Sequence, residues 1–177
     1  GRTSSVNSVP VMTGVFRQPT KTLAPGLGDP LIAIGASTGG TEAIKDIVSR
    51  LPSNAPPIVV AQHIPDTFSR SFAERLDELS KMKVYHAEHG QKIGRGCVYV
   101  APGSHHLRVA RDRSGLVCTL DDSERVGFHR PSVNVLFASV AKAPVQPVVG
   151  VILTGMGRDG AEGMKLLQAA GAVTIAQ

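Results

Sequence analysis

The sequence predicts an α/β protein with a doubly wound, mainly parallel sheet and a small antiparallel β insertion. Short apolar runs alternate with amphipathic helical patterns near both ends of the chain, which is the pattern of consecutive βαβ units. The middle third instead has short β-like runs separated by turns that contain glycine, such as Pro102-Gly103 and Ser114-Gly115. Turns of this kind are typical of antiparallel pairing.

The first half is expected to contain two strand-helix units. Strands are predicted over 31–35 and 57–62, and each precedes a helix, over 41–51 and 67–80. The second helix carries large apolar residues at three- and four-residue spacing: Phe68, Phe72, Leu76 and Leu79. This spacing predicts one apolar face packed against the sheet.

The remaining elements follow from the same patterns. Four short strands in antiparallel pairing are expected over 83–86, 97–101, 107–110 and 116–120. A helix over 131–142 follows, with Pro131 in its favoured early position. The chain then predicts a strand over 148–153, a helix over 160–170 and a last strand over 172–176.

Residues 1–29 have the composition of a flexible linker. Residues 1–28 contain no Asp or Glu, and prolines interrupt any periodicity in this segment. We expect residues 30–177 to form one globular domain, since a chain that is 42% hydrophobic can bury a substantial core. The sequence begins without Met, so the linker is expected to follow an upstream module.

The charge, aromatic content and cysteine pattern of the chain indicate what kind of partner and which cellular compartment to expect. A net charge of +5 permits an anionic partner, but aromatic residues make up only 4% and no nucleic-acid-binding signature is present. Cys97 and Cys118 form no C-x-x-C pair, which favours a reducing, cytoplasmic setting. The chain has neither an apolar run long enough for a membrane span nor a signal-peptide core, so no membrane insertion is expected.

The run Gly35-Ala36-Ser37-Thr38-Gly39-Gly40 lies where the first strand gives way to the first helix. Serine hydrolases with a G-x-S-x-G turn expose their nucleophile at such a sharp bend, so Ser37 is a candidate nucleophile. Glycine-rich turns also bind phosphate, and many only cap a helix. Because no dinucleotide or Walker fingerprint is present, the phosphate hypothesis weakens. A non-catalytic anion-binding module that uses the Gly35–Gly40 turn remains the alternative.

Two further reactive side chains follow predicted strands. His63 comes directly after the second strand, and Asp159 follows the strand over 148–153. The carboxyl ends of parallel strands meet at one edge of a sheet, so Ser37, His63 and Asp159 are expected to lie together. They supply a nucleophile, a general base and an orienting carboxylate. Singly, each also has a plain explanation, as a hydrogen-bonded histidine or a helix-capping aspartate.

The other histidines give weaker signals. The His86-x-x-His89 pattern, with Glu88 inside it, has no further convergent ligand, so we expect two surface histidines, no metal and no other cofactor. His106 and the pair His129-Arg130 either line a substrate cleft or make structural hydrogen bonds.

From about Pro30 to Gln177 the chain closely resembles the catalytic domain of the CheB-type chemotaxis methylesterases. Five runs carry the resemblance, in order: Ile32-Ala33-Ile34-Gly35-Ala36-Ser37-Thr38-Gly39-Gly40, Gln62-His63-Ile64-Pro65, Tyr99-Val100-Ala101-Pro102-Gly103, His129-Arg130-Pro131-Ser132 and Leu153-Thr154-Gly155-Met156-Gly157-Arg158-Asp159-Gly160. The family often has Asp where this chain has Asn134. It also continues beyond the equivalent of Gln177, so we expect the C-terminus of the domain to be incomplete.

This resemblance implies a protein-glutamate methylesterase that hydrolyses γ-glutamyl methyl esters on methyl-accepting chemotaxis receptors and also deamidates receptor glutamines. It places the catalytic triad on Ser37, His63 and Asp159. It further implies an upstream receiver domain of two-component signalling, whose phosphorylation relieves inhibition. In the resulting mechanism the backbone N–H groups of Thr38 and Met156 are candidates for stabilising the oxyanion.

Overall fold

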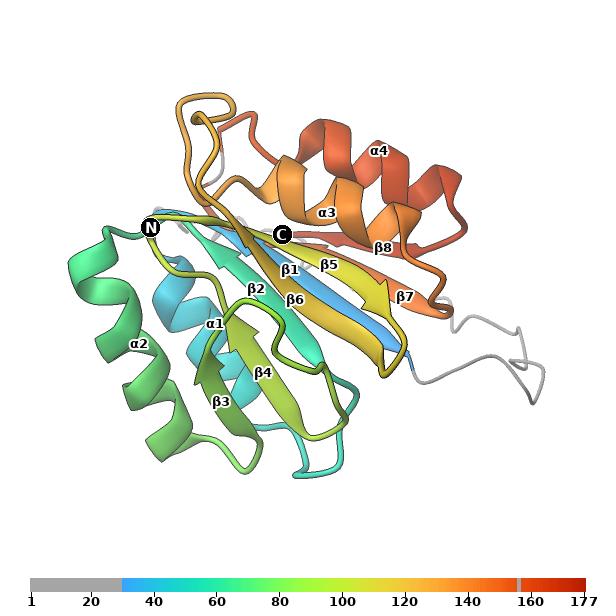
Figure 1. The fold of residues 1–177 in the computed structure, drawn as a ribbon. Coiled ribbons are helices and arrows are strands. Elements are labelled where there is room, and N and C mark those ends of the chain that lie inside the picture. The colour runs from blue at the N-terminus through green and yellow to red at the C-terminus, as the bar shows by residue number, and fades with distance from the viewer. Residues whose placement is uncertain (1–29, 156) are drawn as a thin grey trace, which may run out of the picture.

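A six-stranded parallel sheet organises residues 30–155 and 157–177, which are the residues that the computed structural model describes (Figure 1). The sheet order is β3-β4-β2-β1-β7-β8. Its strands are β1 (Leu31–Ala36), β2 (Ile58–Gln62), β3 (Lys83–His86), β4 (Cys97–Val100), β7 (Val148–Ile152) and β8 (Val173–Ala176). A separate antiparallel hairpin contains β5 (His106–Asp112) and β6 (Gly115–Asp121). The predicted fold class is confirmed, while the expected linker lies outside the described residues.

Helices cover both faces of the sheet (Figure 1). On one face, α1 (Gly40–Val48) and α2 (Asp66–Leu79) pack on a buried cluster that includes Ile34, Ile44 and Leu76. On the other face, α3 (Val133–Lys142), α4 (Ala161–Ala169) and the β5–β6 hairpin enclose a second cluster around Tyr99 and Phe137. Alternate residues of each central strand enter opposite clusters, as the period of two along a strand requires.

Strand β1 lies at the point where the winding of the sheet reverses. It pairs with β2 on one side and with β7 on the other, so that Ile34 lies between Val60 and Val151. Open α/β sheets bind their ligands at such a switch point, outside the carboxyl ends of the strands. The three strands that lead to Ser37, His63 and Asp159 are therefore neighbours.

The prediction that the strands over 83–86 and 97–101 belong to an antiparallel region is wrong. Strands β3 and β4 pair parallel to each other, and β4 pairs parallel to β2, so both extend the main sheet. The connecting segment crosses over on the hairpin face, where Ala87 and Ile93 enter the second cluster. Because this crossover lacks a helix, the sequence pattern looks like that of a hairpin.

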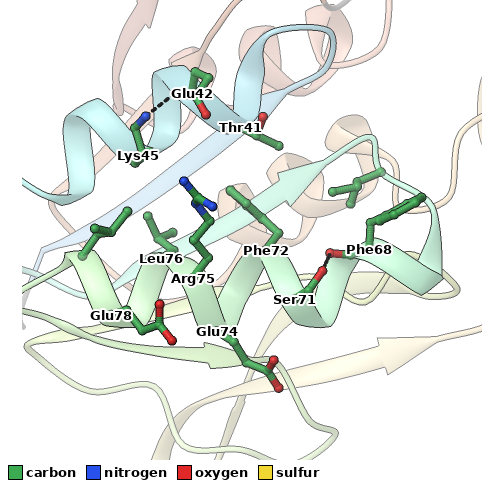
Figure 2. Close-up of a pocket in the computed structure, with 12 residues that line it drawn as sticks. Thr41, Glu42, Lys45, Phe68, Ser71, Phe72, Glu74, Arg75, Leu76 and Glu78 are labelled. Carbon is green, nitrogen blue, oxygen red and sulfur yellow. Dashed lines mark hydrogen bonds and ion pairs between the residues drawn. The ribbon is translucent and has the colours of Figure 1, made fainter.

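The predicted apolar face of α2 is also partly wrong. The helix buries Ser69, Ala73 and Leu76, whereas Phe68 and Leu79 are 60% and 49% exposed. Small residues at 69 and 73 allow α2 to approach the sheet closely, which leaves the large side chains at the edge of the contact. Several of them line a groove of about 880 Å³ between α1 and α2 (Figure 2).

Helix α3 begins two residues later than expected. Ser132 is its N-cap residue, with Oγ accepting a hydrogen bond from Val135 N at 3.4 Å, and Pro131 lies before the cap. Serine is a preferred N-cap residue, and this preference decides the start of the helix. Among the described residues, no helix is long and apolar enough to cross a membrane.

Candidate active site

The Ser37 turn is held by its backbone. Ser37 O accepts hydrogen bonds from Gly40 N at 2.7 Å and from the buried Gln62 side chain at 2.8 Å, while Ser37 N donates to Thr154 O at 3.2 Å. A side chain on Gly40 would overlap the Gln62 amide, so only glycine fits there. Ser37 Oγ itself makes no hydrogen bond with the described residues. The turn thus fixes the backbone of Ser37 from three directions and leaves its hydroxyl available.

His63 directly follows β2 and reaches across the end of β1. Its Nε2 lies 2.7 Å from Asp159 Oδ2, and the His129 ring stacks on its imidazole with centroids 3.7 Å apart and planes within 2°. Its Nδ1 is buried and has no hydrogen-bond partner among the described residues. One ring nitrogen is therefore committed to the carboxylate, and the other is free to accept a proton.

The Asp159 carboxylate is bound at the N-terminus of α3. Besides His63, its oxygens accept hydrogen bonds from Val133 N at 2.7 Å, Asn134 N at 3.0 Å and Ser132 Oγ at 2.8 Å. Burial alone raises the pKa of this carboxyl, but the hydrogen bonds from His63, Asn134, Val133 and Ser132 outweigh it and lower the pKa to about 2. Helix N-termini favour negative charge in this way.

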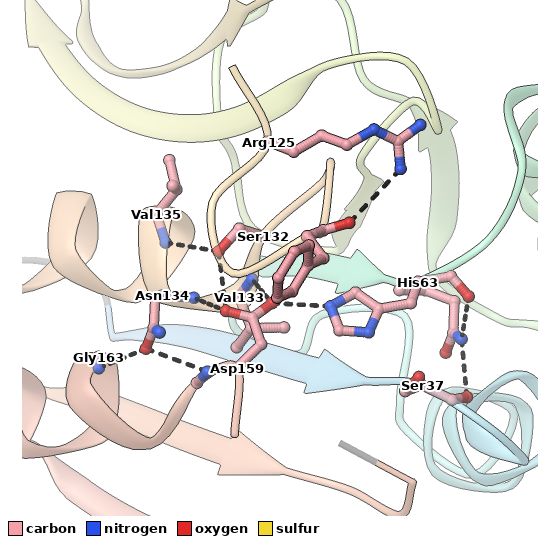
Figure 3. Close-up of polar contacts among 12 residues, drawn as sticks. Ser37, His63, Arg125, Ser132, Val133, Asn134, Val135, Asp159 and Gly163 are labelled. Carbon is pink, nitrogen blue, oxygen red and sulfur yellow. Dashed lines mark hydrogen bonds and ion pairs between the residues drawn. The ribbon is translucent and has the colours of Figure 1, made fainter. Parts of the chain in front are cut away.

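The protonation state of Asp159 decides the tautomer of His63. A carboxylate with a pKa of about 2 is ionised at neutral pH and only accepts hydrogen bonds. His63 Nε2 therefore carries the hydrogen, and Nδ1 of the neutral ring carries the lone pair. Figure 3 shows the Ser37 turn on the side of this imidazole away from Asp159.

A reciprocal capping arrangement between α3 and α4 supports Asp159. The side-chain Oδ1 of Asn134, in the first turn of α3, accepts hydrogen bonds from Gly160 N at 3.0 Å and Gly163 N at 2.8 Å at the start of α4 (Figure 3). Each helix start thus binds a side chain from the other, and Asp159 lies between the two. In the sequence, Asn134 stands out only as a departure from a family pattern, and Ser132 only as part of a motif.

A cleft of about 450 Å³ opens beside the imidazole. His63, His129, Arg130 and Arg125 are among its lining residues. The pKa of His129 is lowered mainly by burial, and further by electrostatic interaction with the His63 and Arg125 side chains, against the opposing effect of Asp159. His129 is therefore neutral at neutral pH, and it presents an uncharged ring to His63.

The structure places Thr38 and His106, two of the residues that the sequence singled out, in different settings. Thr38 follows Ser37 at the surface, and a side chain on Gly155 would lie 2.5 Å from Thr38 N, so the two turns touch. Met156 lies outside the described residues. His106 is fully buried; it accepts a hydrogen bond from Ser132 N at 3.1 Å and donates one to the carbonyl of Glu124 at 3.0 Å. Of the two roles expected for His106, it therefore has the structural one.

The two histidines of the His86-x-x-His89 pattern do not converge. His86 Nε2 lies 2.9 Å from Ser69 Oγ, whereas His89 Nδ1 accepts a hydrogen bond from Leu120 N at 3.1 Å. Within residues 30–155 and 157–177, no group of three or more His, Cys, Asp or Glu side chains is placed to hold a metal ion.

Comparisons of the sequence and of the fold with known proteins agree on one family. The family model described as CheB methylesterase matches residues 32–177. The chain belongs to the CheB methylesterase family. A crystal structure of the CheB methylesterase catalytic domain from Thermotoga maritima superimposes with a TM-score of 0.81 at 38% identity, over 85% of this chain and 80% of that one.

Two curated relatives carry the name protein-glutamate methylesterase/protein-glutamine glutaminase. The one from Saccharophagus degradans is 60% identical over 83% of this chain, and the one from Photorhabdus laumondii is 47% identical over 96% of it. The matched regions are 42% and 49% of those two proteins. This chain therefore spans less than half the length of the relatives it matches.

Proposed function

We propose that residues 30–177 form a methylesterase domain that hydrolyses γ-glutamyl methyl esters on chemoreceptors with a Ser37–His63–Asp159 triad. The observation that carries this proposal is the 2.7 Å hydrogen bond from His63 to the ionised Asp159, across the end of the strand that leads to Ser37. A phosphate cradle would need no imidazole, and a buried carboxylate nearby would repel the anion. The geometry thus favours the enzyme over the anion-binding alternative.

In this mechanism Ser37 Oγ attacks the ester carbonyl while His63 Nδ1 accepts its proton. Asp159 holds Nε2 and stabilises the imidazolium that forms. The tetrahedral intermediate collapses when His63 returns the proton to the methoxy oxygen, so methanol leaves and the glutamyl group stays on Ser37 as an ester. Water, activated by the same imidazole, then releases the glutamate carboxylate and restores Ser37.

Backbone N–H groups would stabilise the oxyanion. Thr38 N follows the nucleophile and precedes the N-terminus of α1, which is the position that supplies a donor in other strand-turn-helix hydrolases. Gly155 lies against Thr38, so Met156 N is the candidate for the second donor. A glutamine amide can follow the same route with ammonia as the leaving group, which accounts for deamidation without additional residues.

The remaining assignments follow from the family. The substrates would be methyl-accepting chemotaxis receptors, and the setting the cytoplasm. Residues 1–29 would link the domain to an upstream receiver domain that covers the cleft until it is phosphorylated. No cofactor takes part in the proposed chemistry.

The test is methanol release from methylated receptor fragments by wild-type protein and by the Ser37→Ala variant. Loss of a triad nucleophile lowers turnover about 10^4- to 10^6-fold in other hydrolases, and we expect a loss in this range. Ser71→Ala, which changes an exposed serine on α2, is the matched control and should retain the wild-type rate. A folded Ser37→Ala protein that still releases methanol at the wild-type rate would exclude the proposed nucleophile.

A further inference from the structure

The loop between β6 and α3 ends in a tight hairpin beside the catalytic imidazole. Val126 N donates to His129 O at 3.0 Å, and His129 N donates back to Val126 O at 3.1 Å. Gly127 and Phe128 form its tip, with φ angles of 57° and 70°. A two-residue turn of this type requires positive φ at both positions. Since the His129 ring stacks on His63, the tip is continuous with the active site.

Phe128 is unfavourable at this tip in two respects. Its positive φ is a conformation that glycine and asparagine adopt easily but that bulky side chains rarely adopt. Its side chain is 91% exposed, more than any other large apolar side chain in the described residues. No burial compensates for the backbone strain, and strain that persists without such compensation is concentrated at functional sites.

The hairpin is held in place without the help of the Phe128 side chain. Arg130 Nη1 donates to the carbonyl oxygens of Asp122 and Ser123, at 2.7 and 3.0 Å, and closes the base of the loop. Arg125 Nη1 lies 3.4 Å from Phe128 O and supports the tip. The exposed ring is thus presented on a preformed backbone, which lowers the entropy cost of binding.

The size and charge of the cleft indicate what meets this ring. A cleft of about 450 Å³ has the size that holds a small molecule or a few side chains, so most of a protein substrate must lie outside it. A protein substrate must therefore contact the rim as well. Arg125 and Arg130 outnumber the one carboxylate of the cleft lining, Asp66, so this rim favours acidic side chains.

We propose that Phe128 is a docking residue for the protein substrate. Its ring packs on an apolar side chain near the scissile ester, while Arg125 faces acidic side chains of the same substrate. The inference rests on the proposed methylesterase function, because it takes the substrate to be a protein surface that carries glutamyl esters. It adds a contact outside the cleft that sets affinity for the substrate and leaves the chemical step alone.

The test compares wild type with Phe128→Asn on two substrates, a methylated receptor fragment and p-nitrophenyl acetate. Phe128→Asn removes the ring but tolerates positive φ, so it should fold and have a higher melting temperature. We expect its KM for the receptor fragment to rise about tenfold with kcat unchanged, as for loss of an aromatic contact at an interface. Its rate on the small ester should stay within about twofold of wild type.

Two control variants complete the experiment. Phe128→Tyr retains the ring and should keep a KM within about twofold of wild type. Leu79→Ala removes an exposed apolar side chain at the far end of α2 and should behave as wild type. An unchanged KM in Phe128→Asn, or an equal loss on both substrates, would overturn the docking role.

Calorimetric binding of the receptor fragment separates this inference from the proposed function, because it needs no turnover. Weaker binding by Phe128→Asn supports the docking role even if the wild-type protein releases no methanol, a result that would count against the esterase alone. Equal binding by the two proteins would overturn the docking role even if methanol is released.

Discussion

Replacing Asp159 with asparagine tests how the active site depends on one buried charge. The variant keeps the shape of the side chain but loses the ionised oxygens that accept four hydrogen bonds, from His63, Val133, Asn134 and Ser132. The amide NH₂ group would face either the imidazole N–H or the helix N–H groups, and both are donors. We expect a mispositioned or wrongly protonated His63, and a fall in kcat of about 10^4, as for the equivalent change in a serine protease.

The cost in stability follows from the pKa of Asp159. A fall from the ordinary value of 3.8 to about 2 on folding corresponds to about 2 kcal/mol of stabilisation at neutral pH. Because folding lowers this pKa, the contribution is complete well above pH 3.8 and is lost as the pH falls to about 2. In a chain of this size, 2 kcal/mol lowers the melting temperature by about 4 to 8 °C.

Urea unfolding of wild type and Asp159→Asn, at several pH values between 6 and 2, measures this contribution. The two free energies of unfolding should differ by about 2 kcal/mol at pH 6 and converge as the pH approaches 2. Asp46→Asn, at an exposed position on α1, serves as the control and should show no such convergence. A difference that stayed constant over this pH range would show that ionisation of Asp159 does not supply the stabilisation.

Substitutions at two further positions, Asn134 and Gly155, test the support of the site. Asn134→Ala leaves Gly160 N and Gly163 N without their acceptor, so it should lower the free energy of unfolding by about 1 to 3 kcal/mol, measured in urea. Asn134→Asp keeps an acceptor oxygen and should recover most of this loss. Gly155→Ala places a methyl group 2.5 Å from Thr38 N at a positive φ, so methanol release should fall at least tenfold while circular dichroism stays native.

The sequence could predict the features that depend on local pattern. Alternating apolar strands and amphipathic helices predict the fold class, Ser37 and His63 directly follow strands, and Asp159 lies in the loop after the strand over 148–153. The hydrogen bond between His63 and Asp159 joins residues far apart in the sequence, but both lie at the same sheet edge. The role of Ser37 as the nucleophile stays a prediction.

Features that depend on tertiary packing could not be predicted. The direction of β4 depends on where the segment before it crosses, and its short β-like pattern fits either pairing. The orientation of α2 depends on the small residues Ser69 and Ala73, which allow close contact but contribute little to an apolar pattern. The capping role of Asn134 and the stacking of His129 on His63 depend on neighbours far along the chain, so no local spacing reveals them.

The position of β1 between β2 and β7 links assembly of the candidate active site to the order in which the chain is made. The strand that leads to Ser37 comes first in chain order among the described residues, but its partner strand β7 forms from residues more than a hundred positions later, at Val148–Ile152. Until that strand has paired, Asp159 has no fixed place and His63 has no carboxylate to orient it. Under the proposed mechanism, a growing or partly unfolded chain would therefore carry an unactivated serine, and attack on esters would have to wait until the central strands are complete.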